Sequence, residues 1–411
     1  MYKTEKENDR VILIGFEEDL TELAELAKTA GCIVIGELHQ NREKPHPKSY
    51  FGKGKAEELA EYTKNLEATM IIADDELSAV QLGYLGEVCG IKVIDRTMII
   101  LDIFANNAKS AEAIAQVEVA QQRYNMSRLK GFGINMSRLG GGIGTRGPGE
   151  KKLETDRRAI RDRINELESE LKQIQSHRQN LRKSRLKNER PVISLVGYTN
   201  AGKSTLMNAL TNANVVAQDK LFATLDTTTK KITFGTTSRE ILLTDTVGFI
   251  KKLPHTLVKA FRSTLEELSY STIILHIVDI SNENYENHME TVYDTMSNLN
   301  CDGIPVITVF NKIDNLDSID KILFDEKAAE TVSISAKTGD NINKVIEKIE
   351  VLLQKLTTTI ELVVPHDRGD VLNIFYKEEN IIEKNYSESG VYIKANISDK
   401  NLSLAKKFQI K

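Results

Sequence analysis

Short apolar runs alternate with amphipathic stretches over residues 10–107. This alternation predicts a small, mostly parallel sheet with helices on its faces. We expect helices over Leu20 to Ala27 and Ala56 to Lys64, and strands over Val11 to Ile14, Cys32 to Ile35, Met70 to Ala73 and Ile91 to Ile94. The stretch Tyr50 to Lys55 has glycines and lysines like a phosphate-binding loop, but no strand precedes it, so a turn is the better interpretation.

Residues 108–190 predict two long helices that form an antiparallel hairpin. The first, 108–130, is polar and rich in alanine, and the second, from 151 to about 188, has a heptad seam. The seam consists of Leu153, Ile160, Ile164, Leu167, Leu171, Ile174 and Leu181, with Arg157 and Arg178 at the two remaining positions. Residues 131–149 contain eight glycines and no helical or strand period. We therefore expect a long, mobile, Gly/Arg-rich loop at the tip of the hairpin.

Residues 191–357 predict a doubly wound α/β domain with its site at the carboxyl ends of the strands. Strands are expected at 192–196, 231–235, 240–244, 272–279, 304–310 and 331–334, and helices from 203, 256, 285, 317 and 341. Residues 358–411 predict a small α+β domain. It should contain a strand over Glu361 to Val364, a helix capped by Asp367 that runs to Tyr376, and a hairpin of Ile381 to Tyr386 with Val391 to Ile397.

Composition indicates a soluble cytoplasmic protein. Of 411 residues, 40% are hydrophobic and 28% charged, and no apolar stretch reaches 18 residues, so we expect no transmembrane segment. The charged start, Met1 to Arg10, lacks the apolar core of a secretory signal. Three scattered cysteines read as reduced thiols, and the seven histidines show no metal-binding spacing. Peripheral membrane association stays open.

The charge is unevenly distributed. Although the whole chain carries −4, residues 109–190 hold 19 Lys and Arg against 10 Asp and Glu, or +9, which leaves −13 for the remainder. A basic segment inside an acidic protein indicates a localised contact with nucleic acid. A solvated, charged helix face is the alternative.

The segment 197–204 fits the pattern G-x-x-x-x-G-K-[ST] and lies between an apolar run, 192–196, and a helix-like run, 205–210. Phosphate-binding loops require this strand–loop–helix context. Glycines let backbone N–H groups converge on phosphate oxygens, and the helix N-terminus adds partial positive charge. We expect Lys203 to reach the β- and γ-phosphates and the Ser204 hydroxyl to bind Mg²⁺. The predicted nucleotide-binding residues here are Gly197, Tyr198, Thr199, Asn200, Ala201, Gly202, Lys203, Ser204 and Thr205.

Two segments are predicted on the γ-phosphate side. The carboxylate of Asp245 can hold Mg²⁺ through water, and the Gly248 N–H can meet the γ-phosphate; their motif is Asp245, Thr246, Val247 and Gly248. A mobile threonine is also needed to bind Mg²⁺ and sense the γ-phosphate. Its segment is Phe222, Ala223, Thr224, Leu225 and Asp226, and both Thr224 and Thr228 have suitable spacing. Lys203, Thr224 and Gly248 are the expected catalytic contacts.

Two further motifs predict guanine recognition. Asp314 can accept hydrogen bonds from guanine N1–H and the exocyclic amine, whereas adenine would leave a buried carboxylate unpaired. Its motif is Asn311, Lys312, Ile313 and Asp314. The backbone of the last motif is expected to contact guanine O6; it consists of Ser335, Ala336 and Lys337. The chain is therefore expected to bind GTP on Mg²⁺ and to hydrolyse it.

These motifs, with Gly-Pro-Gly-Glu at 147–150 and Asp-Thr-Val-Gly-Phe-Ile at 245–250, resemble the HflX family of translation-linked GTPases. The resemblance covers roughly residues 10–357. It implies an α/β N-domain, a helical hairpin and a GTPase domain, association with the large ribosomal subunit, and the splitting or rescue of stalled ribosomes. Thr227 departs from the family, in which many relatives have proline, and the family pattern favours Thr224 as the Mg²⁺ threonine.

Hydrolysis by the isolated protein is expected to be slow. Small signalling GTPases place a water-orienting glutamine just after the glycine that corresponds to Gly248, and Phe249 stands there instead. A partner that completes the site should raise the rate. Asn200 adds an alternative, because in several similar GTPases an asparagine at this place helps to bind K⁺.

Two other functions stay open. One is a regulatory switch that acts on protein or membrane partners without RNA, and the other is an RNA-modification GTPase that dimerises through the hairpin. We expect a monomer, with 1–107, 108–190, 191–357 and 358–411 as its domains. Co-sedimentation with ribosomal subunits separates these hypotheses.

Overall fold

The chain folds into two compact units, which we call unit 1 and unit 2. Unit 1 comprises Met1–Gln175, Gln218–Asp226 and Ile250–Thr264, and unit 2 comprises Ser176–Ala217, Thr227–Phe249 and Leu265–Lys411. The computed structural model describes residues 8–42, 44–136, 148–187, 190–211, 221–222, 225, 228–233, 240–252, 254, 257, 261, 265–316 and 323–410. None of the helices within these ranges is long and apolar enough to cross a membrane.

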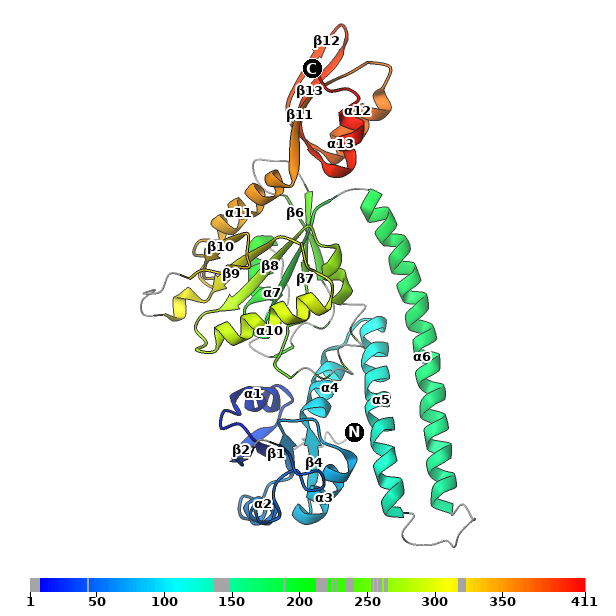
Figure 1. The fold of residues 1–411 in the computed structure, drawn as a ribbon, viewed down its shortest axis with the longest axis vertical. Coiled ribbons are helices and arrows are strands. Elements are labelled where there is room, and N and C mark those ends of the chain that lie inside the picture. Colours follow the sequence, from blue (N-terminus) through cyan, green and yellow to red (C-terminus); the bar gives the residue numbers. More distant parts are fainter. Residues whose placement is uncertain are drawn as a thin grey trace, which may run out of the picture. The chain divides into compact units, whose positions relative to one another are not determined.

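Unit 1 contains a four-stranded parallel sheet in the order β2-β1-β3-β4, as predicted (Figure 1). Its strands are β1 (Arg10–Gly15), β2 (Ile33–His39), β3 (Met70–Ala73) and β4 (Lys92–Asp95). The accompanying helices are α1 (Thr21–Thr29), α2 (Lys53–Asn65), α3 (Ala79–Cys89) and α4 (Arg96–Asn107). The predicted turn at Tyr50–Lys55 is wrong over its second half, because Gly52 caps α2 and the helix begins at Lys53.

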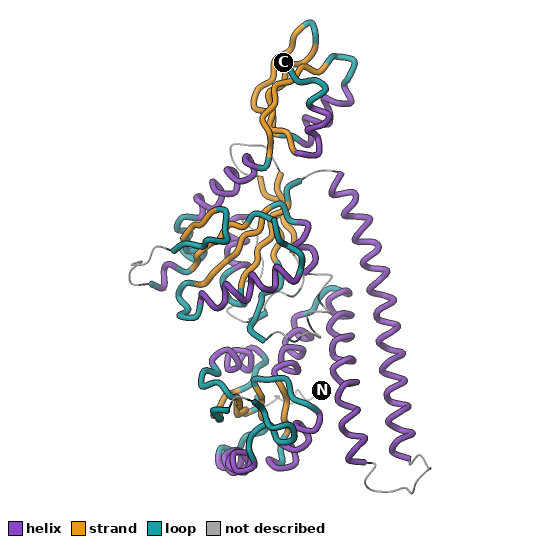
Figure 2. Tube along the Cα trace, in the orientation of Figure 1, coloured by secondary structure: helices purple, strands orange, loops and turns teal. Residues whose placement is uncertain are grey.

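Two long helices follow, α5 (Ala111–Met136) and α6 (Pro148–Lys187), and Figure 2 shows them as a hairpin. Ala115 and Val119 of α5 pack against Leu167 of α6, which lies on the predicted heptad seam. Arg163 pairs with Glu118 at 2.8 Å across the same contact. The antiparallel hairpin is therefore present along the part of α6 that belongs to unit 1.

The loop predicted over 131–149 is too long at both ends. Helix α5 continues through Gly131 and Gly133 to Met136, because a helical glycine costs only about 1 kcal/mol relative to alanine and does not by itself end a helix. At the other end, α6 begins at Pro148, a residue favoured at the first helical position because its missing N–H would have no partner there. The rest of the predicted tip, 137–147, lies outside the described residues.

Unit 2 contains a six-stranded sheet in the order β10-β9-β8-β5-β7-β6, parallel except for β6, which runs antiparallel to β7. The strands are β5 (Val192–Gly197), β6 (Thr228–Thr233), β7 (Glu240–Asp245), β8 (Ile273–Asp279), β9 (Val306–Asn311) and β10 (Glu330–Ser333). The helical elements are α7 (Lys203–Thr211), η2 (Glu266–Tyr270), α10 (Tyr285–Asn298), η3 (Ile313–Asn315) and α11 (Ile342–Lys355). The strand expected at 231–235 thus begins earlier, at Thr228. The starts of the helices expected from 256 and 317 lie outside the described residues.

The C-terminal part of unit 2 is a separate three-stranded antiparallel sheet in the order β11-β13-β12, with its own apolar core. Its elements are β11 (Thr357–Val364), α12 (Gly369–Glu378), β12 (Asn380–Ser387), β13 (Gly390–Ser398) and α13 (Asp399–Ala405). The predicted hairpin is confirmed. The predicted cap is wrong, because Arg368 rather than Asp367 occupies the N-cap position of α12, without a capping side-chain hydrogen bond.

Candidate GTP-binding site

The predicted phosphate loop joins β5 to α7 in unit 2. Gly197 ends the strand and Lys203 begins the helix, so the loop lies at the carboxyl end of a central strand. Asn200 and Gly202 both have positive φ, 62° and 95°, which bends the backbone into a compact loop. A Cβ at Gly202 would collide with the side-chain amide of Asn311, so only glycine fits there.

Lys203 is a buried cation held by neutral groups. Its ammonium donates to the carbonyl oxygens of Tyr198 at 2.7 Å and Gly197 at 3.1 Å, and the side chain is 7% exposed. Burial lowers the pKa of Lys203 to about 8, against an opposing effect of the Asp245 charge. No carboxylate within the described part of the chain forms an ion pair with Lys203 at 4 Å or less. A buried ammonium without a paired anion is suited to an anionic ligand.

The Ser204 hydroxyl and the Asp245 carboxylate, whose oxygens can bind Mg²⁺, lie close together. Ser204 Oγ donates to Asp245 Oδ2 at 2.8 Å, and Asp245 is fully buried at the end of β7. Hydroxyl and carboxylate oxygens are ligands that Mg²⁺ accepts, usually with water and substrate phosphates completing its octahedron. These residues fit that ion. Within the described ranges, no cluster of three His, Cys, Asp or Glu side chains forms a self-sufficient metal site.

The segment after Asp245 closes against the phosphate loop. The Phe249 N–H donates to Gly197 O at 3.1 Å, and the Thr199 N–H donates to Phe249 O at 2.8 Å. A Cβ at Gly248 would lie 3.0 Å from Lys203 Nζ, so glycine allows this close approach. Thr199 Oγ1 is buried and has no hydrogen-bond partner in the described structure. Thr246 and Val247 lie between Asp245 and Gly248 in the sequence. Thr246 Oγ1 donates to Leu195 O at 2.6 Å, and Val247 is buried.

Asn311 connects the phosphate loop to the motif of Ser335, Ala336 and Lys337. Its side-chain Nδ2 donates to Ala201 O at 2.8 Å, and its Oδ1 accepts from the Ala336 N–H at 2.9 Å. The side chain is 2% exposed. Asn311 therefore fixes the distance between the phosphate loop and the base-binding motifs, a structural role that the motif alone did not indicate.

Asp314, the carboxylate predicted to bind guanine, follows Asn311 in the same motif. Asp314 accepts a hydrogen bond from Ser335 Oγ at 2.6 Å, which orients the carboxylate. Asp314 is exposed here rather than buried, because it lies in the short helix η3 beyond the end of β9. Lys312, with φ 66°, pairs with Asp279 at 2.7 Å. The side chains of Ser335 and Asp279 were not predicted to contribute, and both orient the predicted residues.

The remaining predicted residues are placed as follows. Tyr198 stacks on His288 of α10 with ring centroids 3.8 Å apart. Ile313 and Thr205 are half-buried in unit 2, and Lys337 is exposed. Phe222 and Leu225 are buried in unit 1, where the Phe222 carbonyl accepts a 2.8 Å hydrogen bond from Asn107. Ala223, Thr224, Asp226 and Thr227 lie outside the described residues.

Unit 1 contains a cluster of charged side chains that was not predicted from the sequence. Arg96, 3% exposed, contacts Asp74 and Glu22 at 2.6 Å each and donates to the Lys251 carbonyl at 2.9 Å. Lys252 lies 2.7 Å from Asp74 and 3.1 Å from Glu17. We call these residues the Asp74 cluster. It fixes the segment that follows Phe249 along the chain.

Three family models match the chain in succession. Residues 17–105 match the GTP-binding GTPase N-terminal model, 107–185 the GTP-binding GTPase middle region, and 192–312 the 50S ribosome-binding GTPase model. A GTPase HflX from Lacrimispora saccharolytica is 49% identical over 396 residues, which cover 94% of this chain and 93% of that protein. The chain belongs to the HflX family of GTPases.

Other HflX relatives agree. The GTPase HflX of Escherichia coli is 40% identical over 373 residues, 90% of this chain and 87% of that protein. Among solved structures, a GTP-binding protein from Sulfolobus solfataricus in complex with GDP is similar over 85% of this chain and all of that chain, at 23% identity and a TM-score of 0.46. As an HflX GTPase with a phosphate-binding loop, the protein binds and hydrolyses GTP.

Proposed function

We propose that this HflX GTPase binds the large ribosomal subunit and splits or rescues stalled ribosomes in a GTP-dependent cycle. The observation that carries the proposal is the match of residues 192–312 to the 50S ribosome-binding GTPase model. The basic segment 109–190, which carries +9, supports it because cationic helices bind the phosphate backbone of RNA. Among the described residues of this segment, Arg123 pairs with Glu168 and Arg163 with Glu118.

Each motif has a proposed role in nucleotide binding. Lys203, already buried next to Gly248, would neutralise the phosphates, and the unpartnered Thr199 hydroxyl would gain a partner near the γ-phosphate. Ser204 would bind Mg²⁺ directly and Asp245 through water, and this ion supplies further neutralisation of phosphate charge when bound. Asp314, oriented by Ser335, would read guanine.

The switch threonine is proposed to be Thr224. Thr228 lies in β6, where it is paired in register with Asp245 of β7. A residue held in a strand ladder cannot easily move with the state of the nucleotide. Phe249 is 2% exposed and offers no side-chain group to orient water, so slow intrinsic hydrolysis and stimulation by the ribosome are both expected. K⁺ binding at Asn200 would be a separate contribution, tested by comparing rates in K⁺ and Na⁺.

Co-sedimentation tests the proposal. The purified protein is mixed with 30S and 50S subunits in the presence of a non-hydrolysable GTP analogue, GDP or ATP, over a series of salt concentrations. We expect pelleting with 50S under the analogue, less with GDP, and a steep loss with salt because counterions are released on binding. Binding that ignores the nucleotide, or an absence of binding to 50S, would reject the ribosomal role while leaving GTP hydrolysis unaffected.

A further inference from the structure

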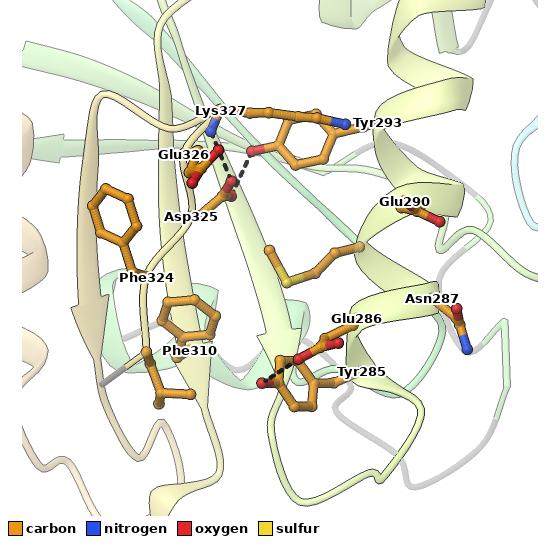
Figure 3. Close-up of a pocket in the computed structure, with 12 residues that line it drawn as sticks. Tyr285, Glu286, Asn287, Glu290, Tyr293, Phe310, Phe324, Asp325, Glu326 and Lys327 are labelled. Atoms are coloured by element: carbon orange, nitrogen blue, oxygen red, sulfur yellow. Dashed lines mark hydrogen bonds between the residues drawn. The ribbon is translucent and has the colours of Figure 1, made fainter. Parts of the chain in front are cut away.

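A cavity of about 540 Å³ lies in unit 2 between α10 and the segment that precedes β10 (Figure 3). Its aromatic lining comes from both sides: Tyr285 and Tyr293 from α10, and Phe310 and Phe324 from the facing segments. Phe310 is buried, whereas Phe324 is 68% exposed. A large exposed aromatic side chain at the mouth of a cavity is typical of an interaction site. The GTP-binding motifs use none of these residues.

The cavity has a strongly acidic rim. Four carboxylates, those of Glu286, Glu290, Asp325 and Glu326, line it against one lysine, Lys327. Glu286, Glu290 and Glu326 are exposed at the cavity. None of the three forms an ion pair within the described part of the chain, and Glu286 only accepts a hydrogen bond from Tyr285 at 3.1 Å. The rim repels phosphate and attracts cations.

The cavity already holds one cation of this chain. Lys327 Nζ lies 4.9 Å from the centroid of the Tyr293 ring, and the Tyr293 hydroxyl donates to the buried Asp325 at 2.6 Å. Lys327 is itself exposed, so its ammonium can be displaced into water. The face of an aromatic ring beside free carboxylates is suited to a guanidinium or ammonium group.

We propose that this cavity binds an arginine- or lysine-bearing segment of a partner protein, with a cationic side chain between α10 and Phe324. Aliphatic parts of such a segment would contact Phe324 and Tyr285, while its charges would face Glu286 and Glu290. RNA is disfavoured because its phosphates would meet an acidic rim. The proposal goes beyond the ribosomal role, since it assigns a protein-binding surface to the GTPase domain.

Fluorescence anisotropy with the full-length protein tests the proposal. The probe is a labelled nine-residue peptide that alternates arginine with leucine, and the control peptide carries neutral citrulline in place of arginine. We expect the arginine peptide to bind, and Glu290→Lys and Phe324→Ser each to weaken it about fivefold to tenfold, because both the charge and the aromatic contact contribute. Lys327→Gln should tighten binding about twofold, because it removes a competing cation.

Glu347→Lys is the matched control, since Glu347 is exposed on α11 and does not line the cavity. It should change affinity less than about twofold, as expected for a distant charge at physiological salt. Equal weakening by Glu347→Lys and Glu290→Lys would overturn the site in favour of a diffuse acidic field. Full displacement of the peptide by spermine at equal concentration, or binding of an oligouridine that Phe324→Ser abolishes, would also overturn it. The assay contains no ribosomes, so its failure is distinguishable from failure of the ribosomal role.

Discussion

The two sheets with parallel strands, one in each unit, place carboxylates and cations at the carboxyl ends of those strands, but among the described residues they differ in whether a buried cation is paired with a carboxylate. In unit 1, Asp95 at the end of β4 is fully buried and accepts hydrogen bonds from Leu77 N, Met98 N, Tyr124 and Arg128. In unit 2, Lys203 is also buried, but among the described residues its ammonium donates hydrogen bonds to the backbone carbonyls of Gly197 and Tyr198 and forms no ion pair with a carboxylate. At the sheet edge of unit 1, groups of the chain itself pair with the buried charge. At the sheet edge of unit 2, the buried charge of Lys203 is suited to an anionic ligand.

The difference shows why an α/β sheet edge does not by itself define a ligand site. In unit 1, charged side chains satisfy one another, so Arg96 and Lys252 compensate the carboxylate of Asp74 at the end of β3. In unit 2, a glycine-containing loop replaces such side chains with backbone groups, and Gly202 approaches Asn311 too closely for any other residue. Substitutions at the two edges should therefore have opposite consequences for stability.

The largest effect is expected in the Asp74 cluster. Arg96→Met should destabilise unit 1 by about 3–5 kcal/mol, because it leaves the mostly buried Asp74 and Glu22 without their main partner. Urea unfolding measures the change. Lys251→Met is the control, since that exposed pair with Glu17 should contribute at most about 1 kcal/mol. Losses of less than about 1 kcal/mol for both variants would show that the buried contacts of Arg96 do not stabilise unit 1.

Substitution of Lys203 should separate function from stability. Lys203→Met should reduce kcat/KM for GTP about 100- to 1,000-fold, because it removes a buried positive charge at the phosphates. The nucleotide-free protein should be at least as stable as the wild type, since methionine removes an unpaired buried ammonium. Phosphate release and thermal unfolding without nucleotide measure both effects. A clear loss of stability would mean that Lys203 has a structural role like that of Arg96.

The base-binding end should give a smaller, more selective change. Asp314→Asn should weaken GTP binding about 100-fold, because the amide cannot accept both guanine hydrogen bonds. Binding of xanthosine triphosphate should improve, since the amide can donate to the extra carbonyl of xanthine. Calorimetry with both nucleotides measures the exchange, and Asp340→Asn, an exposed carboxylate on the neighbouring loop, serves as the control. Unchanged preference for guanine would remove Asp314 from the site.

Features that depend on neighbouring residues in the sequence were predictable, whereas contacts between distant residues were not. The phosphate loop at 197–204 and the strands around it were predictable because glycine spacing, apolar runs and a lysine at the helix start act over a few residues. The Asp74 cluster joins residues such as Arg96 and Lys251, 155 positions apart, and no local pattern marks that contact. The helical course through Gly131 was also missed, because tertiary packing and neighbouring residues override a modest glycine cost.

The smallest effect is a pH dependence that arises from Lys203. Burial lowers its pKa to about 8 from an ordinary value of 10.5, so between these values the unfolded chain holds a proton that the folded, nucleotide-free protein has released. The unfolded state then binds more protons, and the stability of the nucleotide-free protein should rise with pH across this window. Triphosphate binding favours the charged form, so affinity for GTP should fall up to about tenfold per pH unit above 8.

Calorimetry can detect the proton directly. Near pH 8.5, binding of GTP should be accompanied by proton uptake, visible as a binding heat that depends on the ionisation enthalpy of the buffer. Lys203→Met, which cannot take up this proton, should lose that dependence even at the high concentrations needed to observe its binding. Keeping the pH below 9 limits ionisation of guanine itself. A wild-type binding heat that is the same in all buffers would show that Lys203 stays charged without nucleotide. Lys203 and Arg96 would then differ in their contacts and not in their protonation.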